Sequence, residues 1–352
     1  MDVTLVVLLT NRCNKDCSFC FMSKGSRDLL YRDFVTAFQV FYQDMESRNA
    51  ENRYSIVFMG GEPLLNFEVL EKATEWLFQT ISEDRLRLRV VTNGILLNSQ
   101  QSWFLKNPKI QVAVSSYDIK LLEAISIPQM TVKVVLAEEN IDILASRIID
   151  VARHGYFVEC TLADGEDWNV DQHAPKIKKF FKTIQDFFCQ NYELPPPDIL
   201  TTAVWTIHEK HAQCCPGITS FCMDVDGRLY DCDRITPSFN HGAFKLIYDI
   251  KNPPPISQQC MSCKFKNLCS ICPAAQASIH TRDQADMKCL YIQEAISASV
   301  SYLSDLTIRV AEGIMPRSNS HFLKHRPNLT IETLARGCYE TGSIISSERR
   351  RK

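Results

Sequence analysis

Short apolar segments alternate with amphipathic, helix-like segments through the first 190 residues, and this alternation constrains the fold more than any other feature. The segment at 4–10 is almost entirely apolar, as in a strand that is buried on both faces. Further strand-like segments lie at 55–59, 86–92, 110–115, 130–136 and 156–162. Because strands that alternate with helices pair in parallel, the sequence predicts an α/β fold, a partial barrel of six strand–helix units.

Helix-like periodicity fills the intervals between these strands. Helices are expected around 34–45, 67–80, 98–106 and 144–151, and a further helix is expected to have Pro175 in its first turn. In folds of this kind the functional residues sit at the C-terminal ends of the strands. The residues expected there include Cys13, Gly60, Asn93 and Ser115.

The chain changes character after residue 194. The prolines at 195–197 are typical of a linker. Residues 210–290 lose the periodicity, and they are rich in cysteine and poor in apolar residues. We therefore expect this segment to be stabilised by bound metal ions or clusters. Helical periodicity returns at 290–311. We therefore expect a barrel over 1–195, a cysteine-rich domain over 210–290, and a C-terminal helix and tail over 291–352.

Charge and hydropathy exclude several classes of partner. The net charge is −2, so bulk electrostatics favour neither nucleic acid nor an anionic membrane. No apolar run reaches the roughly 18 residues that a transmembrane helix needs. The N-terminal segment has neither the basic region nor the cleavage site of a signal peptide. We expect a cytoplasmic protein.

Fifteen cysteines are many for a chain of 352 residues. Three fall within 13–20, eight within 214–272 and one at 289. In a long chain without a signal peptide, clustered cysteines indicate metal or cluster ligands rather than disulfides. The isolated Cys160, Cys189 and Cys338 are interpreted as buried, inert thiols.

The first cysteines, Cys13, Cys17 and Cys20, have the spacing C-x3-C-x2-C. Three thiolates in one loop can ligate three corners of a cubic [4Fe–4S] cluster, which leaves the fourth iron open and therefore reactive. A zinc loop that borrows a fourth ligand is the alternative, although no histidine follows closely.

This motif, together with Gly60-Gly61-Glu62-Pro63 after the second strand, resembles the radical S-adenosylmethionine (SAM) superfamily. The resemblance implies that the turn formed by these four residues meets the amino group of the cofactor's methionine. It also implies reductive cleavage of SAM and abstraction of a substrate hydrogen by the resulting 5′-deoxyadenosyl radical. Weaker resemblances suggest further cofactor contacts at Asn93, Ser115 and Leu162, which could equally be a turn residue, a capping hydroxyl and a core leucine.

The later cysteines resemble the SPASM domain, the auxiliary-cluster extension of radical enzymes that modify peptides. The spacings Cys215-x11-Gly227-x4-Cys232 and Cys260-x2-Cys263-x5-Cys269 fit it, and Cys272 follows one residue early. Similarity to the anaerobic sulfatase-maturating enzymes implies two interleaved [4Fe–4S] clusters. Cluster I would be held by Cys215, Cys222, Cys232 and Cys272, and cluster II by Cys260, Cys263, Cys269 and Cys289. Cys214 could replace Cys215, and two zinc ribbons remain an alternative.

Asp233 follows Cys232 directly. In the sulfatase-maturating enzymes an aspartate in this place acts as a base, so the resemblance implies a catalytic role for Asp233. A hydrogen-bonded loop residue is the alternative interpretation.

The resulting hypothesis is a radical SAM oxidoreductase with three [4Fe–4S] clusters. Its expected substrate is a residue of a ribosomally made precursor peptide or a protein, and its product a crosslink such as a thioether, an epimerised residue or an oxidised side chain. A flavodoxin- or ferredoxin-type electron donor is an expected partner. Because Cys13 leaves no room for an N-terminal leader-binding domain, either a separate leader-binding protein or the rim of the barrel itself is expected to hold the leader. The alternatives are a radical SAM dehydrogenase of a small molecule and a non-catalytic cluster- or zinc-binding scaffold.

Overall fold

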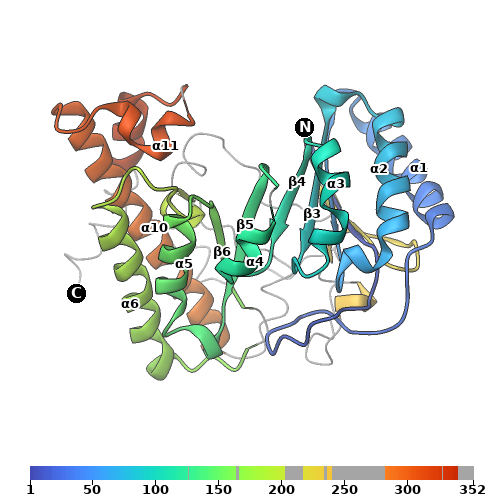
Figure 1. Cartoon of the computed structure of the whole chain (residues 1–352), viewed down its shortest axis with the longest axis horizontal. Helices are drawn as coiled ribbons and strands as arrows, with labels where there is room; N and C mark the ends of the chain where they lie inside the picture. Colours follow the sequence, from blue (N-terminus) through green and yellow to red (C-terminus); the bar gives the residue numbers. More distant parts are fainter. Residues whose placement is uncertain are drawn as a thin grey trace. The chain divides into compact units, whose positions relative to one another are not determined.

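The protein is described from a computed structural model that covers residues 1–125, 127–163, 166–202, 217–233, 236–239, 282–326 and 328–339 (Figure 1). It is a mixed α/β fold with a parallel sheet, as expected from the sequence. The chain divides into two compact units. The first unit comprises Met1–Thr131, Gln213–Pro254 and Cys272–Ser278, and the second comprises Val132–Ala212, Pro255–Ile271 and Ile279–Lys352. The domain limits drawn from the sequence stay a prediction.

The sheet of the first unit has the order β4-β3-β2-β1-β7-β8. Its strands are β1 (Asp2–Leu8), β2 (Arg53–Met59), β3 (Leu86–Thr92), β4 (Ile110–Val114), β7 (Ser220–Met223) and β8 (Leu229–Tyr230). Neighbouring strands pair in parallel, except that β7 and β8 form an antiparallel hairpin. The register opposes Leu5 to Ile56 and Val6 to Cys222. The carboxyl ends of β1 to β4 therefore lie along one edge of the sheet.

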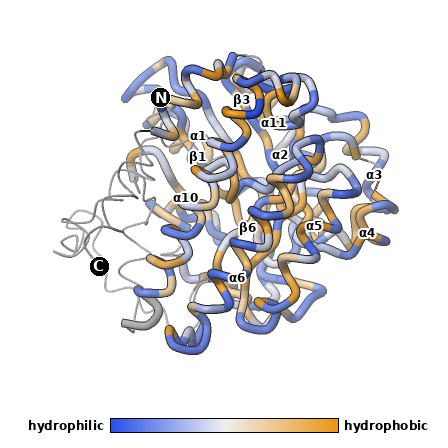
Figure 2. Tube along the Cα trace, turned by 90° about the vertical axis from the view of Figure 1, so that its left-hand side faces the viewer, coloured by the Kyte–Doolittle hydropathy of each residue, from blue (hydrophilic) through white to orange (hydrophobic). Residues whose placement is uncertain are grey.

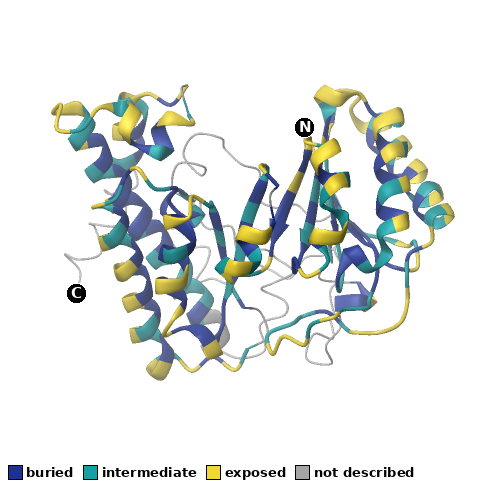
Figure 3. Cartoon of the chain, viewed as in Figure 1, coloured by how far each residue is buried: buried dark blue, intermediate teal, exposed yellow. Residues whose placement is uncertain are grey.

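Four helices of the first unit follow its strands: α1 (Tyr31–Arg48), α2 (Phe67–Thr80), α3 (Leu97–Lys106) and α4 (Ile119–Ala124). Figure 1 shows α1, α2 and α3 on the same side of β3. Phe34 and Phe38 of α1 are fully buried, and both rings meet the Trp76 ring of α2 edge-on. Exposed residues lie on the outer turns of α1 and α2 (Figure 3). Packing of apolar helix faces on apolar strands thus builds the core of this unit.

The second unit holds most of β5 (Met130–Leu136), which pairs in parallel with β6 (Val158–Leu162). Its labelled helices among the described residues include α5 (Leu144–Arg153), α6 (Val170–Phe188), α10 (Arg282–Ala311) and α11 (His321–Lys324). Hydrophilic and hydrophobic residues alternate along α5 and α6, as amphipathic helices require (Figure 2). The Phe181 ring of α6 packs against the Tyr291 ring of α10 at a centroid distance of 5.2 Å.

The described structure also has a helix over 331–339 and short 3-10 helices: η1 (Pro63–Asn66), η2 (Glu83–Arg85), η3 (Glu138–Asn140), η4 (Asp198–Leu200), η6 (Pro237–Phe239) and η7 (Arg317–Asn319). No helix in the described ranges is both long enough and apolar enough to cross a membrane.

Most strand and helix limits from the sequence are confirmed within a few residues, and those of α2 and β3 are the predicted 67–80 and 86–92. The predicted start of α6 is wrong. Asn169 caps this helix by accepting a hydrogen bond from Gln172 N (2.9 Å), so the helix begins at Val170 and Pro175 lies in its second turn. The prolines at 195–197 are buried and so do not form an exposed linker.

Three further elements were not foreseen. The segment 210–290, expected to be loop-like, contributes β7 and β8. In addition, the expected helix α10 begins at Arg282 rather than near 290. Helix α4 was also missed, because only Leu122 of its six residues is buried and so no apolar periodicity marks it.

Candidate active site

The three N-terminal cysteines lie in the segment that joins β1 to α1, and we call residues 11–27 the cysteine loop. Its base is closed by an antiparallel bridge between Thr10 and Asp28. Asn11 N donates to Arg27 O (2.9 Å) below the cysteines, and Leu29 N donates to Leu9 O (2.9 Å). The loop therefore starts and ends at one point on the carboxyl edge of the sheet.

An ion pair closes the base of the loop further. Nε and Nη2 of Arg12 donate to the two carboxylate oxygens of Asp28 over 2.9 and 2.7 Å, and Nη2 also donates to Leu65 O (2.8 Å). Such a bidentate pair adds geometric specificity to its energy. The sequence analysis missed this pair, for which an arginine directly before Cys13 was the sole signal.

The cysteine loop presents three free thiols, with Cys17 exposed and Cys13 and Cys20 half-buried. The pKa of Cys17 is raised, first by loss of water around its thiol and then by the neighbouring charge of Cys20, with a smaller contribution from Cys13. The Cys17 thiol thus interacts electrostatically with both Cys20 and Cys13.

The donor set of three thiols in one loop suits three corners of a cubic cluster. Within the described ranges, no group of three or more His, Cys, Asp or Glu side chains could hold one metal ion. A single zinc ion needs its thiolates within about 2.3 Å of one point. A cubic cluster instead binds each thiolate at a different iron, so the thiols need not converge.

The turn at 60–63 packs directly on the base of the cysteine loop. Gly61 N donates to Thr10 O and Glu62 N donates to Arg12 O, both over 2.8 Å. A Cβ at Gly60, where φ is +140°, would lie 2.5 Å from Thr10 O, and a Cβ at Gly61 would lie 2.2 Å from Arg12 O. Both glycines are therefore required for the approach of the protein's own backbone.

Glu62 is fully buried, and both of its carboxylate oxygens have protein partners. Oε1 accepts from the Thr92 hydroxyl (2.7 Å) and from Leu64 N (3.1 Å), and Oε2 accepts from Asn93 N (2.8 Å). Burial raises the pKa of Glu62, although these three hydrogen bonds act to lower it. The carboxylate thus connects the end of β2 to the end of β3. A contact between Glu62 and the cofactor stays a prediction.

Asn93 continues this connection into the cysteine loop. Its Nδ2 donates to Asn14 Oδ1 over 2.6 Å, and its Oδ1 accepts from Ile95 N over 3.1 Å. Asn14 lies between the first two cysteines. The structure therefore brings together the cysteine loop, the 60–63 turn and Asn93.

The remaining predicted cofactor contacts lie at two strand ends. Ser115 directly follows β4, is exposed, and donates from its backbone N to Thr92 O (2.7 Å). Leu162 is half-buried at the end of β6 in the second unit, where it pairs with Leu136 of β5. The roles assigned to these two residues stay predictions.

Two predicted ligands of cluster I lie in the first unit. Cys222 is on β7 and Cys232 lies two residues after the end of β8, and both are buried. Burial, followed by the charges of Asp233 and Asp224, raises the pKa of Cys222 well above its usual value. Cys232 Sγ donates to Asp233 Oδ1 over 3.2 Å. The structure therefore places the Asp233 carboxylate beside the Cys232 thiol.

The other predicted auxiliary ligands divide into two groups. Cys289 is half-buried on α10, and its Sγ accepts from Gln293 Nε2 over 3.1 Å. The remaining predicted auxiliary ligands lie outside the described ranges, and they are Cys214, Cys215, Cys260, Cys263, Cys269 and Cys272.

Comparison with known proteins identifies relatives. The family model described as Radical SAM superfamily matches residues 7–153. An uncharacterized protein of Methanocaldococcus jannaschii is 33% identical over 112 residues, which are 32% of this chain and 37% of that protein. The radical SAM cyclopropyl synthase TigE of Paramaledivibacter caminithermalis is 28% identical over 126 residues, covering 31% of this chain and 26% of that protein. This chain thus matches well under half the length of these curated relatives.

Solved structures share the fold. Native anSMEcpe with bound AdoMet and Kp18Cys peptide has a TM-score of 0.62 at 16% identity, covering 89% of this chain and 100% of that chain. Streptococcus suis SuiB bound to precursor peptide SuiA has a TM-score of 0.52 at 14% identity, covering 77% and 71%. At these identities the likeness concerns the fold.

Proposed function

Because residues 7–153 form a radical SAM domain, we propose that this protein cleaves SAM reductively and abstracts a hydrogen from a residue of a precursor peptide or protein. A radical SAM domain implies one [4Fe–4S] cluster and SAM as cofactors. The observation that carries the proposal is the joining of the cysteine loop to the 60–63 turn by the hydrogen bonds from Gly61 N and Glu62 N.

Cys13, Cys17 and Cys20 would hold the cluster, which has no fourth protein ligand and so leaves one iron open for SAM. When bound, this pair of cofactors supplies an electron to the sulfonium and a radical that takes a hydrogen atom. The chain orients the pair and excludes water from it. Backbone groups of the 60–63 turn would meet the methionine end of SAM, while Asn93 and Ser115 would contact the rest.

A peptide substrate is supported by the proteins to which this chain is similar in fold and sequence. Solved structures of the same fold contain a Kp18Cys peptide and the precursor peptide SuiA, and one sequence relative is a cyclopropyl synthase. The product would be a crosslink such as a thioether, an epimerised residue or an oxidised side chain. A flavodoxin- or ferredoxin-type donor would supply electrons, and a separate protein would present the leader of the peptide.

The later cysteines would hold two auxiliary [4Fe–4S] clusters, which brings the total to three per chain. Asp233 would act as a base, and its carboxylate lies 3.2 Å from Sγ of Cys232, a predicted ligand of cluster I. A carboxylate beside a redox centre can accept the proton that a substrate loses on oxidation.

Anaerobic reconstitution followed by iron analysis and mass spectrometry tests the proposal. We expect about twelve irons per chain, as three cubic clusters require, and formation of 5′-deoxyadenosine from SAM under a strong reductant. Replacing Cys13, Cys17 and Cys20 together with Ala should remove about a third of the iron and all of the 5′-deoxyadenosine. Cys338→Ala is the matched control, because Cys338 belongs to no predicted ligand set, and it should change neither value.

The substrate class is tested with peptides encoded by short reading frames beside the gene. A mass change in one such peptide supports peptide maturation. Cleavage of SAM that is coupled to oxidation of a small-molecule alcohol instead of a peptide would favour the dehydrogenase alternative. Zinc with little iron would contradict the radical mechanism altogether.

A further inference from the structure

We propose that Phe239 and Asp224 are positioning residues that hold the cysteine loop in its cluster-binding conformation. They would thereby couple the segment bearing Cys222 and Cys232 to the first cluster. The inference rests on the proposed function in one respect, namely that Cys13, Cys17 and Cys20 bind a cluster.

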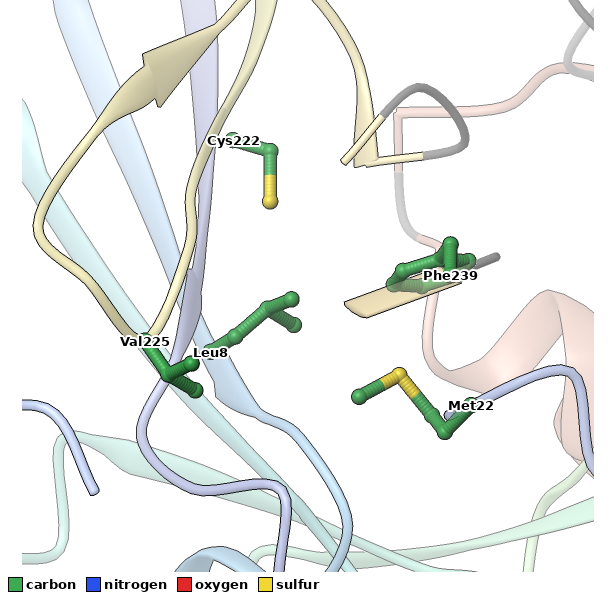
Figure 4. Close-up of a cluster of buried hydrophobic side chains, with 5 residues drawn as sticks. All are labelled: Leu8, Met22, Cys222, Val225 and Phe239. Carbon is green, nitrogen blue, oxygen red and sulfur yellow. The ribbon is translucent and has the colours of Figure 1, made fainter. Parts of the chain in front are cut away.

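A small apolar core joins the two sets of cysteines within the first unit. Its buried members are Leu8, Met22, Cys222, Val225 and Phe239, and we call them the loop core. Figure 4 shows Leu8 and Cys222 directed into the same interior space that Met22 and Phe239 approach from the other side. Cys20 and Phe21 pack against this core and are partly buried. The third cysteine of the loop and Cys222 of β7 therefore contact one apolar cluster.

Phe239, which lies outside the cysteine loop in the sequence, packs against the loop at Phe21. Its ring stacks on the Phe21 ring with centroids 4.6 Å apart and planes inclined by 22°. Next to this stack, Ser23 N donates to Ser238 O over 2.7 Å. Residues directly after Cys20 are thus fixed both by an aromatic contact and by a backbone hydrogen bond.

Asp224 fixes Phe239 in turn. Its side chain is 2% exposed and accepts hydrogen bonds from Val225 N (2.7 Å), from Ser238 N (3.3 Å) and from the Ser238 hydroxyl. A buried carboxylate with three donors sets the backbone around it firmly, because leaving any donor unpaired is costly. Asp224 thereby fastens η6, which carries Phe239, to the hairpin of β7 and β8.

The pairing of β7 with β1 explains how Asp224 and Phe239 can affect the loop that would bind the first cluster. β7 lies beside β1 with Cys222 opposite Val6, and the cysteine loop leaves the end of β1. A change at Cys222 or Phe239 therefore alters the packing beneath Cys20. Ligands must be ordered to bind a metal, so a loosened loop binds its cluster more weakly.

Electron paramagnetic resonance (EPR) of the reduced holoenzyme separates the clusters, because SAM binds only the one with an open iron. The measured quantity is the number of spins, per folded chain, whose EPR spectrum changes when SAM is added. We call this the SAM-responsive spin. Phe239→Ala should lower this SAM-responsive spin at least about twofold by loosening the loop, whereas Phe239→Tyr should retain it because the stack is kept. Asp224→Asn should act in the same direction as Phe239→Ala.

Phe187→Ala is the matched control, since Phe187 is a half-buried phenylalanine of α6 in the second unit, and it should leave the signal unchanged. If circular dichroism shows that Phe239→Ala has lost its structure, Phe239→Leu carries the test, because it keeps apolar volume and removes the stack. Full SAM-responsive spin in the folded Phe239 variant overturns the inference. Absence of SAM-responsive spin in the unmodified protein instead contradicts the proposed function.

Discussion

Asn93 Nδ2 donates to Asn14 Oδ1 over 2.6 Å, and this contact ties the end of β3 to the loop that carries the three N-terminal cysteines. Asn93 is itself held by the buried carboxylate of Glu62, which accepts from its backbone N. Asn14 immediately follows Cys13, so the network orders the first cysteine before any cofactor arrives. Ordering of this kind lowers the entropic cost of assembling the site.

This network is tested by a double-mutant cycle. Asn14→Ala and Asn93→Ala should each lower the free energy of unfolding, and the coupling between them should be about 1 kcal/mol because they share one hydrogen bond. Urea unfolding of the metal-free protein measures these values. Asn107 bonds Trp103 O instead, so the pair Asn14→Ala and Asn107→Ala should be additive within about 0.5 kcal/mol. Additivity for Asn14 and Asn93 would show that their contact is absent in solution.

Asp198 predicts a pH dependence of stability. Burial raises its pKa to about 7, although the hydrogen bond from Cys160 N acts to lower it. Glu159 raises this pKa further, and Lys133 lowers it. Between about pH 4 and pH 7 the folded protein thus holds a proton that the unfolded chain releases, so stability falls as the pH rises through this window. Asp198→Asn should remove that fall.

The measurement is the free energy of unfolding at pH 5 and at pH 8 for each protein. The loss on going to pH 8 should be larger in the unmodified protein than in Asp198→Asn. Asp186→Asn, at an exposed site on α6, should behave like the unmodified protein. Equal losses in all three proteins would mean that Asp198 is ionised throughout.

Asp233 is tested by Asp233→Asn, which keeps the shape of the side chain and removes the base. If Asp233 accepts a substrate proton, 5′-deoxyadenosine should still form while the modified peptide falls by about 10²-fold or more. Mass spectrometry measures both products. Asp226→Asn is the control, because Asp226 lies in the β7–β8 turn and pairs with Arg228. An unchanged peptide yield would reduce Asp233 to a loop residue.

Loss of a ligand of the proposed cluster I and loss of ligands of the proposed cluster II should differ in their effect on SAM cleavage. Replacing Cys260 and Cys263 with Ala should abolish peptide modification and leave some 5′-deoxyadenosine, because in the proposed function SAM would be cleaved at the cluster held by Cys13, Cys17 and Cys20. Cys222→Ala should lower SAM cleavage as well, because Cys222 belongs to the loop core beneath Cys20. Product analysis of the two variants, with circular dichroism to show that each is folded, makes the comparison. Full peptide modification by a folded Cys260 and Cys263 variant would make cluster II dispensable.

Local pattern was sufficient for much of the fold. The amphipathic spacing of α2 and the apolar alternation of β3 gave limits that the structure confirms. Pattern was insufficient for α6, where the capping side chain of Asn169 overrides the preference of Pro175 for a first turn. It also missed β7, because four residues are too short for a periodicity to show.

The sequence by itself determined the chemistry that this protein can support. Cys13, Cys17 and Cys20 lie within eight residues of one another, and glycines at 60 and 61 follow a strand, so both motifs can be identified from the sequence without a fold. The tertiary structure alone decided which residues hold these motifs in place. Arg12 with Asp28, Asn14 with Asn93 and Phe21 with Phe239 are separated by 16, 79 and 218 residues, the differences of their numbers. Contacts at such separations come from how strands and loops pack together, and no local pattern of residues encodes them.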